Sequence, residues 1–176
     1  MHFTNSSANI FSFDGFLPEI EKNVFVSSDC KIIGKVKIKD NSSIWFKCVL
    51  RGDVNCISIG NSTNIQDGTI IHVSRLSGGS TSIGDFVTIG HRALIHACNI
   101  ENHAFIGMGA IVMDNVEIES DSMIAAGSLV TPGKRVLSGE LWGGSPARFM
   151  RKLTSTEINN NRETAHHYVK LSKKYL

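Results

Sequence analysis

Three histidines occur at a spacing that suits a metal ion. His91 and His96 form an H-x4-H pair, and His72 follows a Gln-Asp-Gly segment upstream. Neutral imidazole is a common ligand of divalent metals, and zinc held by three nitrogens keeps a fourth position open for water. Such a site generates hydroxide near neutral pH. The alternative interpretation is a set of surface histidines that binds no metal.

The elements that position these histidines follow from a six-residue repeat. A period of six fits neither a helix nor a simple strand. It fits a short strand plus a turn, three of which close a triangular coil of about 18 residues. We therefore expect an all-β chain, a left-handed parallel β-helix, rather than a β-sandwich. The repeating aliphatic positions are Val26, Ile32, Ile38, Ile44, Leu50, Ile59, Ile65, Ile71, Ile83, Ile89, Ile95, Ile100, Ile106, Val112, Ile118, Ile124, Val130 and Val136.

Two insertions interrupt this repeat. Three extra residues lie between Leu50 and Ile59, and an extra hexad, RLSGGS, lies between Ile71 and Ile83. Its Gly-Gly pair and its serines predict a loop outside the coil, at residues 75–80.

With that hexad subtracted, His72 and His96 are one coil apart. They should then stack on adjacent rungs of one face. His91 has a different phase and should point elsewhere within the same subunit. A complete three-nitrogen site would therefore need His91 from a neighbouring chain, as threefold packing of parallel prisms would allow.

The chain is predicted to form one domain. Residues 1–150 should form the β-helix with its N-terminal lead-in, and residues 151–176 a C-terminal α-helix. Thr154 and Glu157 have capping-box spacing at the start of an amphipathic pattern over about 155–174. Because the ends of a solenoid need covering, we expect this helix to cap the coil.

Composition excludes several classes of partner. Lys and Arg total 18 against 16 Asp and Glu, which gives no argument for binding nucleic acid. No run approaches the ~18 consecutive apolar residues of a membrane span. The scattered cysteines suit reduced thiols in the cytoplasm better than a disulfide framework, and Cys98 should be a small buried filler. The four cysteines are Cys30, Cys48, Cys56 and Cys98.

Several segments resemble the signature stretches of gamma-class carbonic anhydrases. They are LRGDVN, NIQDGTIIH and IGHRALIHACNIENHAFIGMGAIVMD, within a likeness that covers about residues 15–150. The resemblance implies a homotrimer with metal sites at subunit interfaces. It implies that His72 and His96 come from one subunit and His91 from the next. By motif position it also assigns interface pairing and hydrogen bonding at the metal to Arg51, Asp53, Gln66 and Asp67.

The activity implied is reversible hydration of carbon dioxide to bicarbonate by metal-bound hydroxide, with zinc favoured and iron or cobalt also compatible. Tyr168 falls where related proteins place a tyrosine near the metal, although it could equally pack the helix. The archetypal enzyme carries glutamates that move the proton. This chain has Val54 and the acid-free segment RLSGGST instead, so we expect slow turnover.

Two other functions fit the same scaffold. Hexapeptide-repeat trimers commonly bind CoA between subunits, so an acyl-CoA transferase or thioesterase could use one histidine as general base. A metal-stabilised trimer without catalysis, serving as an assembly subunit, is the third hypothesis. Fold alone does not choose among these functions.

Overall fold

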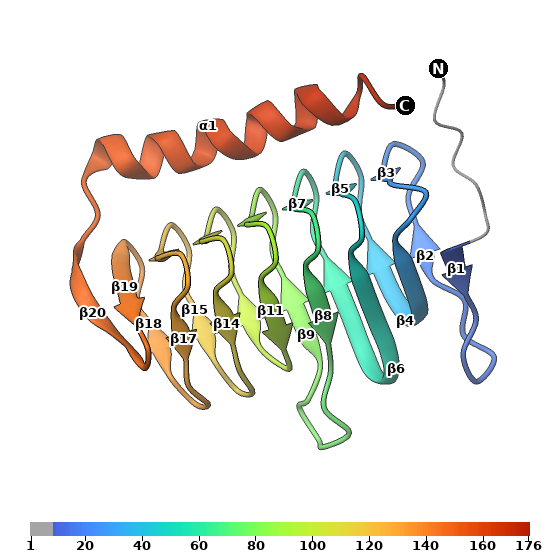
Figure 1. Ribbon diagram of the computed structural model, residues 1–176, viewed down its shortest axis with the longest axis horizontal. Helices are drawn as coiled ribbons and strands as arrows, with labels where there is room; N and C mark the ends of the chain where they lie inside the picture. Colours follow the sequence, from blue (N-terminus) through green and yellow to red (C-terminus); the bar gives the residue numbers. More distant parts are fainter. Residues whose placement is uncertain (1–8) are drawn as a thin grey trace.

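The computed structural model describes residues 9–176, which form a left-handed parallel β-helix with one long α-helix beside it (Figure 1). The fold predicted from the six-residue repeat is confirmed. Each turn of the coil places strands on three faces of a prism, and within the coil the strands pair in parallel with their equivalents one turn later. No helix in the described part of the chain is long and apolar enough to cross a membrane.

One face of the prism is an eight-stranded sheet, here called the helix face. Its strands are parallel except for the last pair, β19 and β20, which is antiparallel. In spatial order they are β20 (Ala147–Lys152), β19 (Glu140–Gly144), β16 (Met123–Ile124), β13 (Phe105–Ile106), β10 (Thr88–Ile89), β7 (Asn64–Ile65), β5 (Ser43–Ile44) and β3 (Phe25–Val26).

The other two faces belong to a single twelve-stranded sheet. Two long strands, β4 (Lys31–Ile38) and β6 (Val49–Ile59), run through the corner between them, and β1 (Ile10–Phe11) and β2 (Glu19–Ile20) pair with β4. The histidine face contains β8 (Ile70–His72), β11 (Leu94–His96), β14 (Ile111–Val112) and β17 (Leu129–Val130). The polar face contains β9 (Thr81–Ile83), β12 (Asn99–Ile100), β15 (Glu117–Ile118) and β18 (Arg135–Val136).

The repeat positions form the core. Nearly all of the predicted aliphatics are buried, and they stack in register from rung to rung: Ile71 pairs with Ile95, and Ile95 with Val112. Val26 is the exception, being only partly buried at the first rung. Burial of an aliphatic side chain contributes roughly 1.5–3 kcal/mol, so a stack of this length is the main source of stability.

The corners require unusual backbone angles. Several non-glycine corner residues, among them Ser62, Phe86 and His103, adopt positive φ values of 56° to 62°. Such angles are strained for most residues and tolerated where the tight turn demands them. At Gly90 the constraint is steric, because an added Cβ would lie 2.7 Å from the backbone nitrogen of Met108 in the next rung.

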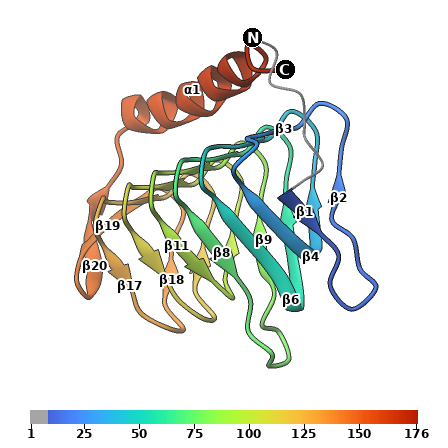
Figure 2. The same ribbon diagram turned by 45° about the vertical axis from the view of Figure 1, so that its right-hand side comes forward.

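The core positions still stack in register on both sides of each insertion. The ladder pairs His72 directly with His96, so the hexad at 75–80 does not occupy a rung. It projects from the coil as a loop between β8 and β9 (Figure 2). The three extra residues after Leu50 are accommodated inside β6, where the pairing with β4 shifts between Gly34 and Val36.

The C-terminal helix α1 (Ser155–Ser172) is confirmed, and it lies along the helix face rather than across an end of the coil (Figures 1 and 2). It contacts β5, β7 and β10. The sequence pattern specifies that one side of the helix must be buried, but it does not say against which surface.

Specific contacts fix the start and the middle of α1. Thr154 and Glu157 complete the predicted capping box, and Arg151 hydrogen-bonds to the Glu157 carboxylate. These bonds, with that from Arg151 the largest, lower the pKa of Glu157 to about 2. Farther along, Arg162 donates two hydrogen bonds, of 2.9 and 2.8 Å, to the Asp121 carboxylate at a corner of the coil.

The core stack can be tested with two deletions of equal size. Ile118→Ala removes a fully buried side chain and should lower the free energy of unfolding by about 2–5 kcal/mol. Leu137→Ala removes as many carbons from a side chain that is 45% exposed, and should cost less than about 1 kcal/mol. Denaturant titration of both variants measures the difference. Equal losses would contradict a core built on the repeat positions.

Candidate metal centre

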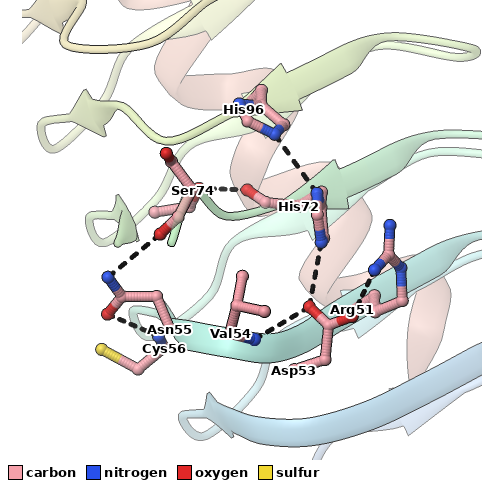
Figure 3. Close-up of polar contacts among 9 residues, drawn as sticks. Arg51, Asp53, Val54, Asn55, Cys56, His72, Ser74 and His96 are labelled. Atoms are coloured by element: carbon pink, nitrogen blue, oxygen red, sulfur yellow. Dashed lines mark hydrogen bonds and ion pairs between the residues drawn. The ribbon is translucent and has the colours of Figure 1, made fainter. Parts of the chain in front are cut away.

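His72 and His96 face each other across one rung, as the repeat predicts. Their backbones pair in the parallel ladder between β8 and β11. The Nδ1 atom of His72 lies 3.2 Å from the Nε2 atom of His96, and both rings are partly exposed (Figure 3).

Asp53 holds the far side of the His72 ring. Its Oδ1 atom lies 3.0 Å from His72 Nε2, and its other oxygen accepts from Arg51 (Figure 3). Burial acts to raise the pKa of Asp53, but the hydrogen bonds from His72 and Arg51 together outweigh it and keep that pKa below its usual value. Arg51 lies one rung below His72, because the ladder pairs Leu50 with Ile71.

His96 has a carboxylate of its own that the sequence analysis did not identify. Its Nδ1 atom lies 2.6 Å from Oδ1 of Asp114, in the corner after β14. The ladder pairs Ile95 with Val112, 17 residues later, because the repeat takes a five-residue step between Ile95 and Ile100. Counting in register from His96 therefore leads to Met113, and Asp114 is the residue after it.

His91 lies at a different corner of the coil, between the helix face and the histidine face. Its Nδ1 atom is 2.8 Å from Oδ2 of Asp67, which lies one rung below as predicted. His91 lines an open hollow of about 390 Å³ with Arg92 and Met108. Within one chain, no three His, Cys, Asp or Glu side chains among residues 9–176 are grouped to hold a metal.

The donor chemistry of the His72–His96 pair fits a cation. An ionised carboxylate can only accept a hydrogen bond, so the protons of both rings are committed to Asp53 and Asp114. In neutral rings, the two nitrogens that face each other then both carry free lone pairs, and a metal ion between them would satisfy both. Two ligands of a tetrahedral zinc ion, each at about 2.0–2.1 Å, would be roughly 3.3 Å apart, close to the 3.2 Å observed.

Comparisons with known proteins agree with this chemistry. A model described as "Bacterial transferase hexapeptide (six repeats)" matches residues 97–132. The chain is 44% identical to "Probable carbonic anhydrase" of Methanocaldococcus jannaschii over 88% of its own length and 96% of the relative. It is 52% identical to "Gamma carbonic anhydrase 2, mitochondrial" of Arabidopsis thaliana over 89% of its own length. The chain belongs to the gamma-class carbonic anhydrase family.

The match to the plant relative spans 58% of that protein's length. Among solved structures, a "hexapeptide transferase family protein" from Anaplasma phagocytophilum is 48% identical, with a TM-score of 0.91. The match covers 95% of this chain and 98% of that one. The similarity to these proteins therefore extends over nearly the whole coil.

Gln66, which the gamma-class motif places near the metal, lies at the end of β7 and is buried. Its amide nitrogen donates to Oδ1 of Asn64 at 3.1 Å, and its backbone carbonyl accepts from the Cys48 thiol. The side chain is thus held by the layer of buried polar residues beneath α1.

Tyr168 lies in the aromatic cluster under the second half of α1. Its ring packs edge-on against Trp45, with centroids 5.5 Å apart. Burial, and then the charge of Asp67, raise the pKa of Tyr168, so its hydroxyl stays protonated at neutral pH. The contact with Trp45 shows that the Tyr168 ring packs α1 against the coil.

The segment that replaces the acidic loop of the archetypal gamma-class enzyme is tied down by Asn55. The Asn55 amide donates to the backbone carbonyl of Ser74 at 3.2 Å (Figure 3). It also donates to the carbonyl of Leu76 at 3.3 Å. Val54 is 51% exposed beside it. Neither Val54 nor the 75–80 loop brings a carboxylate or an imidazole to the histidine face.

His103 lies at a corner of the coil with a positive φ of 62°. Its ring stacks on Phe86, with centroids 5.4 Å apart. Its Nδ1 atom is buried, and burial is the main cause of its lowered pKa. The corner is covered by α1, whose His166 approaches Phe86 from the helix side.

The two roles open to Tyr168 can be separated by substitution. Tyr168→Phe keeps the ring on Trp45 and should leave the free energy of unfolding within about 0.5 kcal/mol of wild type. Tyr168→Ala removes the ring and should cost about 1–3 kcal/mol, with faster hydrogen exchange in α1. Hydrogen-exchange mass spectrometry with a denaturant titration gives both results. A large loss in the Phe variant would show that the hydroxyl, not the ring, matters for stability.

Proposed function

We propose that this chain is a metal-dependent lyase that interconverts carbon dioxide and bicarbonate. The observation that carries the proposal is the His72–His96 pair, in which two nitrogens 3.2 Å apart are both left as acceptors. Membership of the gamma-class family supports the same reaction. Zinc is the metal proposed, and iron or cobalt would also suit imidazole ligands.

The proposed site is shared between subunits of a homotrimer. His72 and His96 supply two nitrogens, and His91 of the partner subunit supplies the third. Two features support this arrangement. His91 is 40% exposed on a separate corner, and an apolar ridge runs beside the histidines on the same face. Its large exposed side chains, stacked on successive rungs, are Ile70, Leu94 and Ile111.

Zinc held by three neutral imidazoles lowers the pKa of a coordinated water to about 7 and so supplies hydroxide at neutral pH. The chain's own residues orient the imidazoles: Asp53 fixes His72, and Asp67 fixes His91. Arg51 neutralises Asp53 at the proposed subunit seam, where an unpaired charge would be costly. Gln66 and Tyr168 are retained as proposed site residues from the family motif.

A second candidate function is acyl transfer or thioester hydrolysis with CoA. It is favoured by the names "Bacterial transferase hexapeptide" and "hexapeptide transferase family protein" among the matches. A trimer that holds metal without catalysis is the third. We also propose a cytoplasmic location, supported by four free cysteines of which three are buried.

The shared site can be tested by mixing two defective chains. His72→Ala and His91→Ala should each abolish metal binding, because each removes one of three ligands. After co-refolding, a mixed trimer should regain some complete sites, since a His91→Ala subunit still offers His72 and His96. Bound zinc is measured on isolated mixed trimers. Mixed trimers that form but recover no metal would contradict a site built from two subunits.

The reaction itself should be slow and dependent on buffer. Val54 and the 75–80 loop offer no group that ionises near neutral pH, so the proton must leave to buffer. General acid–base groups contribute about 10²–10⁴-fold, so Ser77→Glu should raise the hydration rate several-fold at low buffer and little at high buffer.

Stopped-flow hydration assays over a range of imidazole concentrations measure this effect, with Ser77→Gln as the uncharged control. A metal-replete trimer without hydration at any buffer concentration would refute the lyase and favour the CoA or assembly function.

A further inference from the structure

Every histidine of the proposed centre has its own carboxylate. Asp53 lies 3.0 Å from His72, Asp114 lies 2.6 Å from His96, and the third carboxylate, Asp67, lies 2.8 Å from His91. By contrast, the buried Nδ1 atom of His103 has no hydrogen-bond partner within the described residues.

Each carboxylate contacts a single ring nitrogen, and this selects the tautomer. The proton sits on Nε2 of His72, but on Nδ1 of His96 and of His91, because those atoms face the acceptors. The nitrogens left with a free lone pair are Nδ1 of His72 and Nε2 of the other two rings. His72 therefore presents the opposite nitrogen from His96, which is how two rings on adjacent rungs converge on one point.

Asp114 is well placed to act in this way on His96. Its backbone carbonyl accepts from the Gly133 amide at 3.0 Å, and the next amide, of Asn115, donates to Ala97 at 2.8 Å. The turn is thus tied to the rungs on both sides. The side chain is 34% exposed and leans back onto the ring one rung below.

We infer that Asp114 is a positioning residue of the metal centre, which fixes His96 as the Nδ1–H tautomer and aims its Nε2 atom at the metal. This inference deepens the proposed function and rests on it for the identity of the site. It adds a residue to the set identified from the sequence, namely Arg51, Asp53, Gln66, Asp67, His72, His91, His96 and Tyr168.

Zinc affinity provides the first test. Loss of such a partner of a metal-bound histidine typically costs about 10–100-fold in metal affinity, and we expect a loss of that size for Asp114→Ala in the assembled protein. Asp114→Asn should recover part of it, because the amide oxygen still accepts from Nδ1–H. Glu117→Ala is the matched control: it removes one carboxylate that is 60% exposed on the polar face. It should leave affinity within about twofold of wild type.

A second readout uses the metal-free protein and does not depend on activity. In ¹⁵N-histidine spectra, His96 of wild type should show the shift pattern of a ring protonated at Nδ1. Asp114→Ala should move the His96 signal toward the commoner Nε2–H form, and Asp114→Asn should not. A purely structural role in the turn would leave this signature unchanged in all three proteins.

The outcomes separate the two proposals. If the wild-type protein binds zinc but does not hydrate carbon dioxide, the proposed activity is refuted. The Asp114 tests would still apply, because they measure zinc affinity and the His96 tautomer. Zinc affinity within twofold of wild type in Asp114→Ala would overturn the inference. An unchanged His96 tautomer in that variant would also overturn it. An Asp114→Ala variant that keeps its zinc affinity and loses only buffer-independent turnover would overturn it as well. In that case the carboxylate would act as a proton acceptor and not as a positioning residue.

Discussion

The register of the parallel ladder is the constraint on which the rest of the molecule depends. Aliphatic side chains point inward at each repeat position and stack from rung to rung, so the residue that follows each of them points outward at a fixed height. Rungs of parallel strands lie about 4.8 Å apart, which brings His72 within 3.2 Å of His96. A slip of one residue would turn the histidines inward and the core outward. The packing of the core therefore fixes the relative positions of the two histidines.

The electrostatics of the site follow from that closeness. Two unprotonated nitrogens that face each other repel, and the ladder keeps the backbones of the two histidines paired. Asp53 and Asp114 hold the ring protons on the outer nitrogens, so that neither inner nitrogen carries one. Their negative charges also lie close to the histidine pair. A divalent metal relieves both effects at once. Together with Arg51, a zinc ion would carry as much positive charge as the three carboxylates beside the histidines carry negative charge. The chain thus creates a need for a cation as well as ligands for it.

Much of this could be predicted from the sequence because the repeat assigns coordinates to residues. The stacking of His72 on His96, the looped-out hexad and the pairing of Asp67 with His91 all follow from counting. Counting in register failed for Asp114, which is the residue after the position that the ladder aligns with His96. It also failed where a surface is covered by a distant segment. The aliphatic pattern of α1 specifies a buried side but not the surface it packs against, so the helix was expected at an end of the coil.

The position of α1 also affects how the molecule unfolds. A solenoid alone is close to a one-dimensional array in which each rung contacts only its neighbours, and such arrays can fray from either end. The helix and the residues that follow it connect rungs that the array keeps apart: Arg162 is bonded to Asp121 in a late coil, and Tyr175, three residues after α1, packs on Phe25 in the first. Loss of an end rung would cost contacts with α1 as well as with the adjacent rung. Because the helix ties early and late rungs together, it should make the coil open in one cooperative step instead of rung by rung.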